Sequence, residues 1–355
     1  MGLRAPPLLR AVRAARRRRG LQLTRTTSSQ APVFDRELKL RHRARAAAED
    51  AAGVAYLREA AAARVVGRLR DVAAREEKKT ALDLGCGAGH LRAALEADAV
   101  DGDVAGGIAT LAQCDAAPEA VAACASRAPA AGFATTAVVA DEERPLPFDD
   151  ASFDAVLSSG SLHWVNDLPG ALREVRRVLR PDGVFIGALA GAGTLGELQY
   201  CRRPARGRGI ERRRPGARAR GEGGGARAGL AAAEEERTGG VAPRCSPAAR
   251  LADCGQLLHQ AGFKLITVDV ERVQVDFGDA FLLLDDLQRM GEQHAPLAPA
   301  PLGRDALLAA AAAYQHMFPA AGDATALRAS FEMTFLIGWA PDTNEPAPVR
   351  ARGPG

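Results

Sequence analysis

The feature that most constrains this chain is a short apolar segment that runs directly into a loop of alternating glycines. Residues 80–84 have the composition of a buried strand, and the loop that follows contains Gly85, Gly87 and Gly89. Glycine tolerates positive φ angles and lets the backbone approach a ligand closely. In open α/β sheets such a loop lies at the carboxyl end of a strand, where ligands bind. The sequence therefore predicts a strand, a ligand-binding loop and a helix in succession.

Strands and helices alternate on either side of this loop. We expect strands near 80–84, 109–114, 134–140, 153–158 and 184–189, and helices near 90–97, from Pro118 onward and over 168–179. We also expect helices at 251–261, 279–290 and 304–317, and strands at 265–270 and 331–339. Alternation of this kind is typical of an α/β protein with a doubly wound, mostly parallel, Rossmann-like sheet. N-terminal helices and a helical insertion before the last strand complete the expected fold.

Changes in composition suggest where the parts of the chain begin and end. We predict a mitochondrial transit peptide at 1–32, an N-terminal helical segment at 33–78, a ligand-binding core at 79–200, a disordered Arg/Gly-rich insertion at 201–230, the C-terminal part of the same domain at 231–340 and a flexible tail at 341–355.

The basic residues are concentrated in two of these parts. Residues 1–30 hold eight arginines and no acid, which is the pattern of a mitochondrial transit peptide, although a disordered basic arm is the alternative. Residues 201–230 hold ten arginines and two glutamates. Each segment therefore carries +8, so the remaining chain carries −12 of the net +4. An acidic body argues against a nucleic-acid groove.

Residues 201–230 lack any apolar period, so they are expected to be disordered, or to reflect an error in the inferred coding sequence. The chain contains no apolar run of the 18 or more residues that a transmembrane helix needs, so only peripheral membrane association is expected. The six cysteines show no CxxC pair and no metal-ligand spacing. We expect them to be reduced, mostly buried thiols, and we predict no metal site.

The glycine loop is a weak motif by itself, because dinucleotide-binding proteins also use glycine-rich loops. Their fingerprint is G-x-G-x-x-G. Counted from Gly85 the last position is His90, and counted from Gly87 it is Arg92, so both registers fail. S-adenosylmethionine (SAM) has no phosphate but carries an amino group. The carboxylate of Asp83, beside the loop, suits that group.

Acids at the ends of the next two strands extend the same interpretation. Asp115 ends the second strand, where a carboxylate can accept hydrogen bonds from both ribose hydroxyls. Asp141 and Glu142 end the third strand, where the adenine amino group would lie. The alternative is that Asp115 and Asp141 are only helix N-caps or turn residues. The sequence therefore predicts a SAM site at Asp83, Gly85, Gly87, Gly89, Asp115, Asp141, Glu142 and Ser158.

The loop that begins at Ser158, after the fourth strand, would border both the cofactor and the substrate pocket. Methyl transfer gains mainly from positioning, and it needs a general base only when the nucleophile carries a proton. His163 is the candidate base, and Trp164 is a candidate to pack on the sulfonium by a cation–π contact. Pocket wall or core packing is an equally good interpretation of both side chains.

Several stretches of the chain resemble a known family. Segments 83–89, 140–142 and 153–156 are similar to class I SAM-dependent methyltransferases in general. Segments 161–169 (SLHWVNDLP) and 179–188 (LRPDGVFIGA) together resemble the mitochondrial complex I assembly factor 5 family, and more distantly the malonyl-carrier-protein methyltransferases. Further matching stretches are 33–36 (VFDR), 285–292 (DDLQRMGE) and 337–339 (IGW). The similarity spans about residues 33–340, apart from 201–230.

The resemblance implies a peripheral protein on the matrix face of the inner membrane that acts early in complex I assembly. It also implies hydroxylation of an arginine on a core iron–sulfur subunit. The chain departs from the family at Gly196, where a tyrosine is usual, and near 241–244, where a histidine-containing stretch is replaced. These departures concern the substrate side.

The residue chemistry alone favours a different reaction. SAM donates a methyl group and no oxygen, and the six histidines include no His-x-Asp/Glu pair for iron. The residues by themselves therefore predict a methyltransferase acting on a small molecule, a carrier-bound acid or a protein. A non-catalytic assembly chaperone is the third alternative.

Overall fold

The computed structural model describes residues 32–48, 53–72, 79–99, 104–130, 132–198, 251–295, 297 and 304–342. The segments predicted as a transit peptide and as an Arg/Gly-rich insertion lie outside these residues, as does the tail after 342. The N-terminal helices are α2 (Arg36–Ala48) and α3 (Tyr56–Val72). The following elements are β1 (Lys79–Leu84), α4 (His90–Asp98), β2 (Ile108–Asp115), α5 (Pro118–Ser126), β3 (Ala134–Val139), β4 (Phe153–Ser159), η3 (Leu162–Trp164), α6 (Leu168–Val178) and β5 (Leu179–Ala190). The C-terminal part comprises α9 (Leu251–Gln260), β6 (Lys264–Phe277), α10 (Ala280–Arg289), α11 (Arg304–Met317), β7 (Pro319–Ala320) and β8 (Asp323–Trp339).

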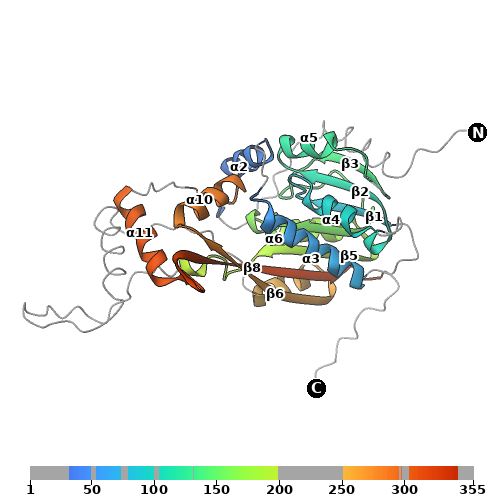
Figure 1. Ribbon diagram of the computed structural model, residues 1–355. Coiled ribbons are helices and arrows are strands. Elements are labelled where there is room, and N and C mark those ends of the chain that lie inside the picture. The colour runs from blue at the N-terminus through green and yellow to red at the C-terminus, as the bar shows by residue number, and fades with distance from the viewer. Residues whose placement is uncertain are drawn as a thin grey trace, which may run out of the picture.

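The strands form one sheet in the order β3-β2-β1-β4-β5-β8-β6, with β7 beside β8 (Figure 1). The first five strands of this order are parallel, and β8 lies antiparallel between β5 and β6. The expected α/β fold with a mostly parallel sheet is confirmed. The chain direction across the sheet reverses between β1 and β4, which is where doubly wound sheets bind ligands.

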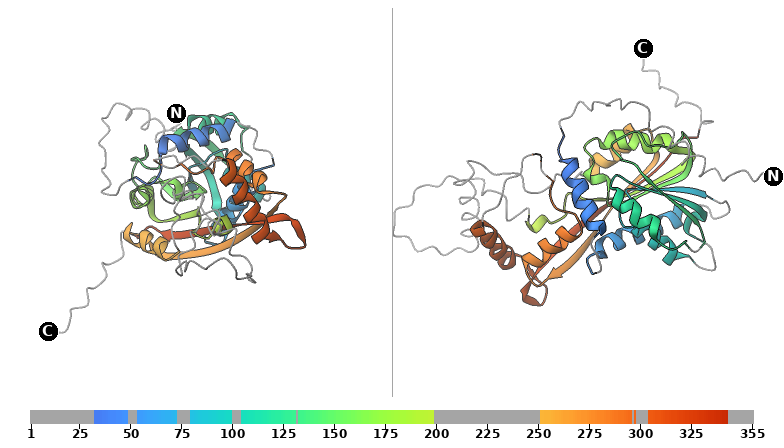
Figure 2. Two further views of the ribbon diagram at one scale, coloured as in Figure 1. Left: turned by 90° about the vertical axis from the view of Figure 1, so that its left-hand side faces the viewer. Right: turned by 90° about the horizontal axis from the view of Figure 1, so that it is seen from above.

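Helices cover both faces of the sheet (Figures 1 and 2). On one face α3 and α4 pack on the strands through Val65, Leu69, Leu91 and Leu95. On the other face α6 and α9 pack through side chains that include Leu172 and Leu258. Because both faces are buried, the central strands are almost continuously apolar, as parallel sheets require. The core therefore fixes the carboxyl ends of β1, β2 and β4 in one row.

The C-terminal strands are longer than the sequence predicts. β6 was expected to end at residue 270 and β8 to begin at 331, but the strands pair from Lys264–Trp339 to Phe277–Leu327, with one register shift between Lys264 and Thr267. The charged residues that interrupt the apolar pattern do not end the strand, because Arg272 and Glu332 face each other and form an ion pair at 3.3 Å. This long hairpin carries α10 and α11, the expected helical insertion, away from the parallel half of the sheet (Figure 1).

Candidate functional site

The glycine loop after β1 has the backbone that the sequence predicts. Gly85, Gly87 and Gly89 have φ angles of 75°, 51° and 82°. The backbone amides of Gly85 and Cys86 both donate to the carbonyl oxygen of Cys114, at 2.8 and 2.9 Å. A Cβ atom at Gly85 would lie 2.2 Å from the side chain of Ser161, so only glycine fits there. The loop is therefore held between β2 and the segment that follows β4.

Two of the predicted acids lie beside this loop in one pocket. Asp83 and Asp115 line it together with Gly85 and Gly87. Asp83 is 1% exposed, and burial raises its pKa to about 7. Asp115 accepts hydrogen bonds from the amides of Gly87, at 3.0 Å, and Ala117, at 2.9 Å. Asp115 thus braces the loop and the turn into α5, and its remaining lone pairs face the pocket.

The acids after β3 lie outside the lining of this pocket. Asp141 pairs with Arg36 at 2.7 Å. Glu142 is 1% exposed and accepts hydrogen bonds from Arg43, at 2.7 Å, and from Ser161, at 2.6 Å. Burial alone would raise its pKa, but the guanidinium groups of Arg43 and Arg36 hold the pKa of Glu142 at about 2. Glu142 is therefore ionised at neutral pH, and both carboxylates are already paired with α2.

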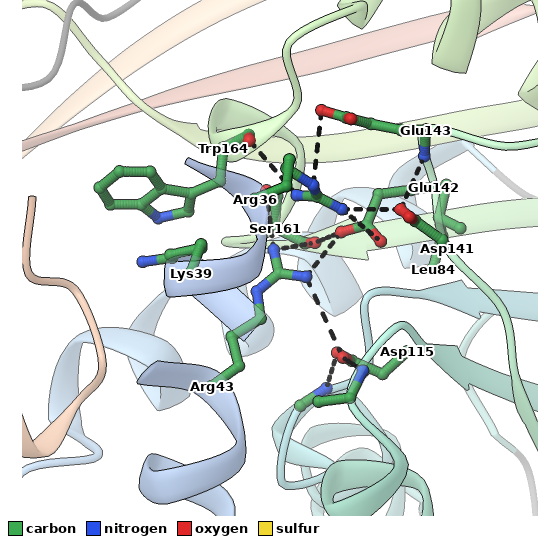
Figure 3. Close-up of polar contacts among 12 residues, drawn as sticks. Arg36, Lys39, Arg43, Leu84, Asp115, Asp141, Glu142, Glu143, Ser161 and Trp164 are labelled. Carbon is green, nitrogen blue, oxygen red and sulfur yellow. Dashed lines mark hydrogen bonds and ion pairs between the residues drawn. The ribbon is translucent and has the colours of Figure 1, made fainter. Parts of the chain in front are cut away.

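Helix α2 borders the pocket through Arg43 (Figure 3). The side chain of Arg43 extends between Glu142 and Asp115 and lies 4.0 Å from the Asp115 carboxylate. It also donates to the hydroxyl oxygen of Ser161 at 2.8 Å. The pocket volume is about 40 Å³, which is room for one or a few waters. The polar groups at the loop fit SAM, but the space fits it only after Arg43 withdraws from Asp115.

The two candidate catalytic side chains, His163 and Trp164, belong to η3 in the loop after β4. Trp164 is 4% exposed and packs edge-on against Phe34. The Nζ atom of Lys39 lies 3.4 Å above the centre of its ring, so that face is already covered. Burial lowers the pKa of Lys39 well below its ordinary value, against the opposing charge of Glu292. His163 lines a second cavity, and burial lowers its pKa, which favours the neutral imidazole. Its Nδ1 atom has no hydrogen-bond partner among the described residues.

Ser158 and Gly89, the remaining predicted residues, have structural positions. The buried hydroxyl of Ser158 donates to the carbonyl oxygen of Leu84 at 2.8 Å and ties β4 to β1. Gly89 is the N-cap of α4, and a Cβ atom there would lie 3.3 Å from the sulfur of Cys124. Neither residue is part of the lining of the pocket.

Glu292 is the residue at the site that sequence reasoning missed. It follows α10 and lines both the small pocket and the second cavity. Its carboxylate accepts hydrogen bonds from Trp164, at 2.7 Å, and Arg58, at 3.0 Å, and lies 3.4 Å from His163. Burial favours the neutral acid, but Lys39 and the other polar neighbours hold the pKa of Glu292 well below its ordinary value. Its only signal in the sequence was its place in the stretch 285–292.

His90 is a second residue that lines the pocket without having been predicted to do so. Burial lowers its pKa to about 4, so the imidazole is neutral at physiological pH. Its Nε2 atom is buried and has no partner among the described residues. It stands at the first position of α4, directly after the glycine loop.

The second cavity is large and mainly apolar. Its volume is about 520 Å³, and it lies between α3, the end of β5, α10 and β8. Leucines dominate its wall, and Glu292 and His163 stand at the end nearest the glycine loop. Gly160, Arg58 and Glu292 line both spaces, so the cavity and the small pocket are neighbours that share a wall. Such a concave apolar space with a few polar groups has the form of a substrate site.

No helix in the part of the chain that the structure describes is long and apolar enough to cross a membrane. In the same residues, no group of three or more His, Cys, Asp and Glu side chains is placed to hold a metal ion.

The glycine loop, the row of strand ends and the sheet order define a protein of the class I SAM-dependent methyltransferase fold. A family model described as "Methyltransferase domain" matches residues 82–187. More narrowly, the chain belongs to the family of the mitochondrial arginine-hydroxylase NDUFAF5. It is 37% identical over 320 residues to the protein of that name from Danio rerio, which covers 90% of this chain and 86% of the relative.

Two further similarities are more distant. The malonyl-[acyl-carrier protein] O-methyltransferase of Xylella fastidiosa is 27% identical over 212 residues, or 59% of each chain. Among solved structures, the YcgJ protein of Bacillus subtilis has a TM-score of 0.48 and 15% identity, over 79% of this chain and 99% of that chain. The resemblance seen in the sequence to the complex I assembly factor family is confirmed by the 37% identity, and the more distant resemblance to the malonyl-carrier-protein methyltransferases by the 27% identity.

Proposed function

We propose that this protein binds SAM at the glycine loop and hydroxylates an arginine on a core iron–sulfur subunit of mitochondrial complex I, in support of its assembly. The observation that carries the proposal is the similarity to the arginine-hydroxylase NDUFAF5 proteins over almost the whole chain. The cavity of about 520 Å³ beside the loop supports it, because a side chain of another protein can enter it.

The pocket supplies the groups that SAM needs at its two polar ends. Asp83 would bind the amino group and Asp115 the ribose hydroxyls, while the positive φ angles of the loop let the backbone approach the aminoacyl chain. When bound, SAM supplies an electrophilic methyl group and a positive charge. Binding also requires Arg43 to leave the space between Asp115 and Glu142, so α2 would move with the cofactor.

The substrate arginine would enter from the apolar cavity. Leu57, Leu195 and Leu287 line this cavity and can pack against the methylene groups of an arginine side chain. Glu292 and His163 stand where that side chain would approach the cofactor pocket. His163 is neutral, because burial lowers its pKa, and it could accept a proton at this point.

Hydroxylation needs an oxygen atom that SAM does not contain. Conversion of a C–H bond to a C–OH bond by dioxygen consumes two electrons and two protons, and the second oxygen atom leaves as water. The reaction therefore requires dioxygen and a two-electron reductant as co-substrates. The alternative, methylation of the same arginine or of a carrier-bound acid, is favoured by the intact glycine loop and needs only SAM.

The test is peptide mass spectrometry of the core iron–sulfur subunit from cells with and without this protein. Cells that lack it would be complemented with the wild-type chain, with Asp115→Ala or with Asp305→Ala. Asp305 is an exposed acid in the first turn of α11, remote from the pocket, so it controls for the loss of a carboxylate. An oxygen-sized mass on one arginine that depends on Asp115 is the expected result.

Each other outcome rejects part of the proposal. A methyl-sized mass would establish a methyltransferase. An unmodified subunit whose assembly still needs the protein, with Asp115→Ala fully active, would establish a chaperone that does not use SAM. Oxygen incorporation that is unchanged in Asp115→Ala would separate the reaction from the cofactor.

We further propose that the protein acts in the mitochondrial matrix, on the matrix face of the inner membrane. The arginine-rich first 30 residues and the mitochondrial relatives support the compartment. Peripheral contact is supported by α10, where Phe281, Leu282 and Leu284 are 37–52% exposed. Fractionation with carbonate extraction, which releases peripheral proteins, tests both statements.

A further inference from the structure

Two cysteines meet beneath the glycine loop. Cys86 belongs to the loop itself, and Cys124 belongs to the last turn of α5. Their sulfur atoms lie 3.7 Å apart, within hydrogen-bond distance of thiols, although 38 residues separate them in the chain. Both are free thiols and at most 5% exposed. Cys86 lines the cofactor pocket, so small solutes in that pocket reach the pair from one side.

The surroundings favour a thiolate at one member of the pair, Cys124. The guanidinium group of Arg127 is close to Cys124, since both would contact a Cβ atom at Gly89, at 3.2 and 3.3 Å. The hydrogen bond with Cys86 lowers the pKa of Cys124 and the charge of Arg127 acts in the same direction, against burial and the carboxylates of Asp83 and Asp115, while the pKa of Cys86 is raised. A thiolate is the reactive form of cysteine, so proximity and charge coincide here.

We propose that Cys86 and Cys124 are a modification site, at which a peroxide forms a reversible disulfide that weakens SAM binding. One thiolate attacks the peroxide, an S–O bond forms, the O–O bond breaks, and water leaves. The second thiol then attacks the sulfenic acid, the S–S bond forms, and a second water leaves. In total two thiols lose two electrons and two protons to one hydrogen peroxide, and a dithiol reductant reverses the reaction.

The disulfide acts on the loop because Cys86 is part of it. A disulfide bond is about 2.05 Å long, so the two sulfur atoms must approach by about 1.7 Å from their present 3.7 Å. The amide next to Cys86, that of Gly87, donates to Asp115, and a shift of the loop toward α5 disturbs this contact. The carboxylate that would bind the ribose is thereby displaced. This effect rests on the proposed binding of SAM at this loop.

Binding and oxidation then oppose each other. SAM in the pocket covers the exposed side of Cys86, and the disulfide distorts the loop that holds SAM. Because coupling between two ligands or modifications is reciprocal in free energy, SAM should protect the thiols about as strongly as oxidation weakens SAM. We expect the dissociation constant of SAM to rise about tenfold on oxidation, a common size for such coupling.

The experiment titrates the full-length protein with hydrogen peroxide, with and without SAM, and maps disulfides by mass spectrometry. Trypsin cuts after Arg92 and Arg127, so Cys86 is on peptide 80–92, while Cys114 and Cys124 share peptide 93–127. Fragment ions of the linked peptides distinguish these two cysteines. Calorimetry with SAM is then performed on the reduced, oxidised and re-reduced protein.

Cys124→Ala is the test variant, because Cys124 is not part of the pocket lining. It should bind SAM as the reduced wild-type protein does and lose all sensitivity to peroxide. Cys254→Ala, which removes a buried thiol of α9, is the matched control and should respond like the wild-type protein.

Absence of the Cys86–Cys124 link, or a link that leaves SAM affinity unchanged, overturns the proposal. If the reduced protein does not bind SAM at all, the proposed cofactor fails, while the disulfide map still decides whether the pair reacts.

Discussion

The small pocket at the glycine loop and the large cavity beside it are lined by residues of opposite polarity, charged in the first and mainly apolar in the second. The pocket has a volume of about 40 Å³ and is bordered by charged groups from α2, β1 and β2. The cavity has about 520 Å³ and is bordered mainly by apolar side chains, among them leucines from α3, α10 and the segment after β5. The first is small and crossed by ion pairs and hydrogen bonds, and the second is large. This contrast teaches that cofactor and substrate sides face different obstacles to binding.

On the cofactor side the obstacle is electrostatic. Arg43 forms an ion pair with the buried carboxylate of Glu142, and Arg36 with the partly buried carboxylate of Asp141 (Figure 3). A ligand must replace those ion pairs, which is favourable only if it offers comparable hydrogen bonds. On the substrate side a ligand meets apolar walls, so shape and burial decide affinity. Glu292, which borders both spaces, is where the two kinds of site meet.

The largest expected effect is on the cofactor side alone. Asp115→Ala removes the carboxylate that would accept both ribose hydroxyls, and hydrogen bonds to charged groups contribute about 1.5–3 kcal/mol each. We expect SAM affinity to fall by about 100-fold or more, with the fold retained. Calorimetry, with Asp305→Ala as control, measures it. Unchanged affinity would remove Asp115 from the cofactor site.

Removing the ion pair between Arg43 and Glu142 should lower the free energy of unfolding. Arg43→Met leaves Glu142, which is 1% exposed, with Arg36 at 3.5 Å as its remaining charged partner. Loss of one member of a buried ion pair typically costs about 3–5 kcal/mol. Because Arg36 remains beside Glu142, we expect a loss at the lower end, about 3 kcal/mol. Urea unfolding measures the loss. Arg41→Met, at an exposed position of the same helix, is the control.

A double variant decides whether the ion pair is the cause. Arg43→Met combined with Glu142→Gln removes the unpaired charge, so most of the lost stability should return. If the double variant is as unstable as the sum of the two single variants, the packing of Arg43 and not its charge supports the pocket.

Filling the large cavity should separate substrate from cofactor. Ala190, at the end of β5, lines the cavity but not the pocket. Ala190→Trp should reduce arginine modification at least about tenfold, because its ring takes up space that the substrate side chain needs. SAM affinity should stay within about twofold. Ala134→Trp, at an exposed position of β3, is the matched control. Equal losses of both properties would show that the two spaces are not independent.

The sequence predicted the cofactor side better than the substrate side for a physical reason. Residues at the ends of successive parallel strands meet at one edge, so Asp83, Gly87 and Asp115 could be brought together from the strand pattern alone. The cavity is lined by residues as distant as Leu57, Leu195 and Phe331. No local sequence pattern predicts this cavity, because it depends on how the long β6–β8 hairpin positions α10.

The sequence also did not predict the ion-pair partners of the charged residues. Asp141 was predicted to meet adenine and Glu142 to belong to the same site, and the structure pairs both with α2, an element about 100 residues earlier. The arginines of α2 are visible in the sequence, but a helix rich in arginine is usually solvent-exposed. Lys39 is another example, since it is buried against Trp164 in a segment that looks uniformly polar. Their burial follows only from where α2 crosses the sheet edge.

The smallest expected effect concerns the protonation of Asp83. Burial raises its pKa to about 7, whereas the ordinary value is 3.8. Because the folded-state pKa is the higher one, the contribution of Asp83 to stability is full at low pH and is lost as the pH rises toward and through 7. The ionised form is nevertheless the one that binds a positively charged amino group. Stability and SAM affinity should therefore change with pH in opposite directions.

For a group with a pKa near 7, the ionised fraction rises about tenfold between pH 6 and pH 8, and SAM affinity should rise by at most this factor. Asp83→Asn should flatten the profile and be the more stable protein at pH 8. Calorimetry and urea unfolding at both pH values measure the two effects. If SAM affinity still depends on pH in Asp83→Asn, the titrating group is a different one. That group cannot be His90, because its pKa of about 4 is too low to cause a change between pH 6 and pH 8. The charges that control binding on the cofactor side would then be the ion pairs that α2 forms, and not the carboxylate beside the glycine loop.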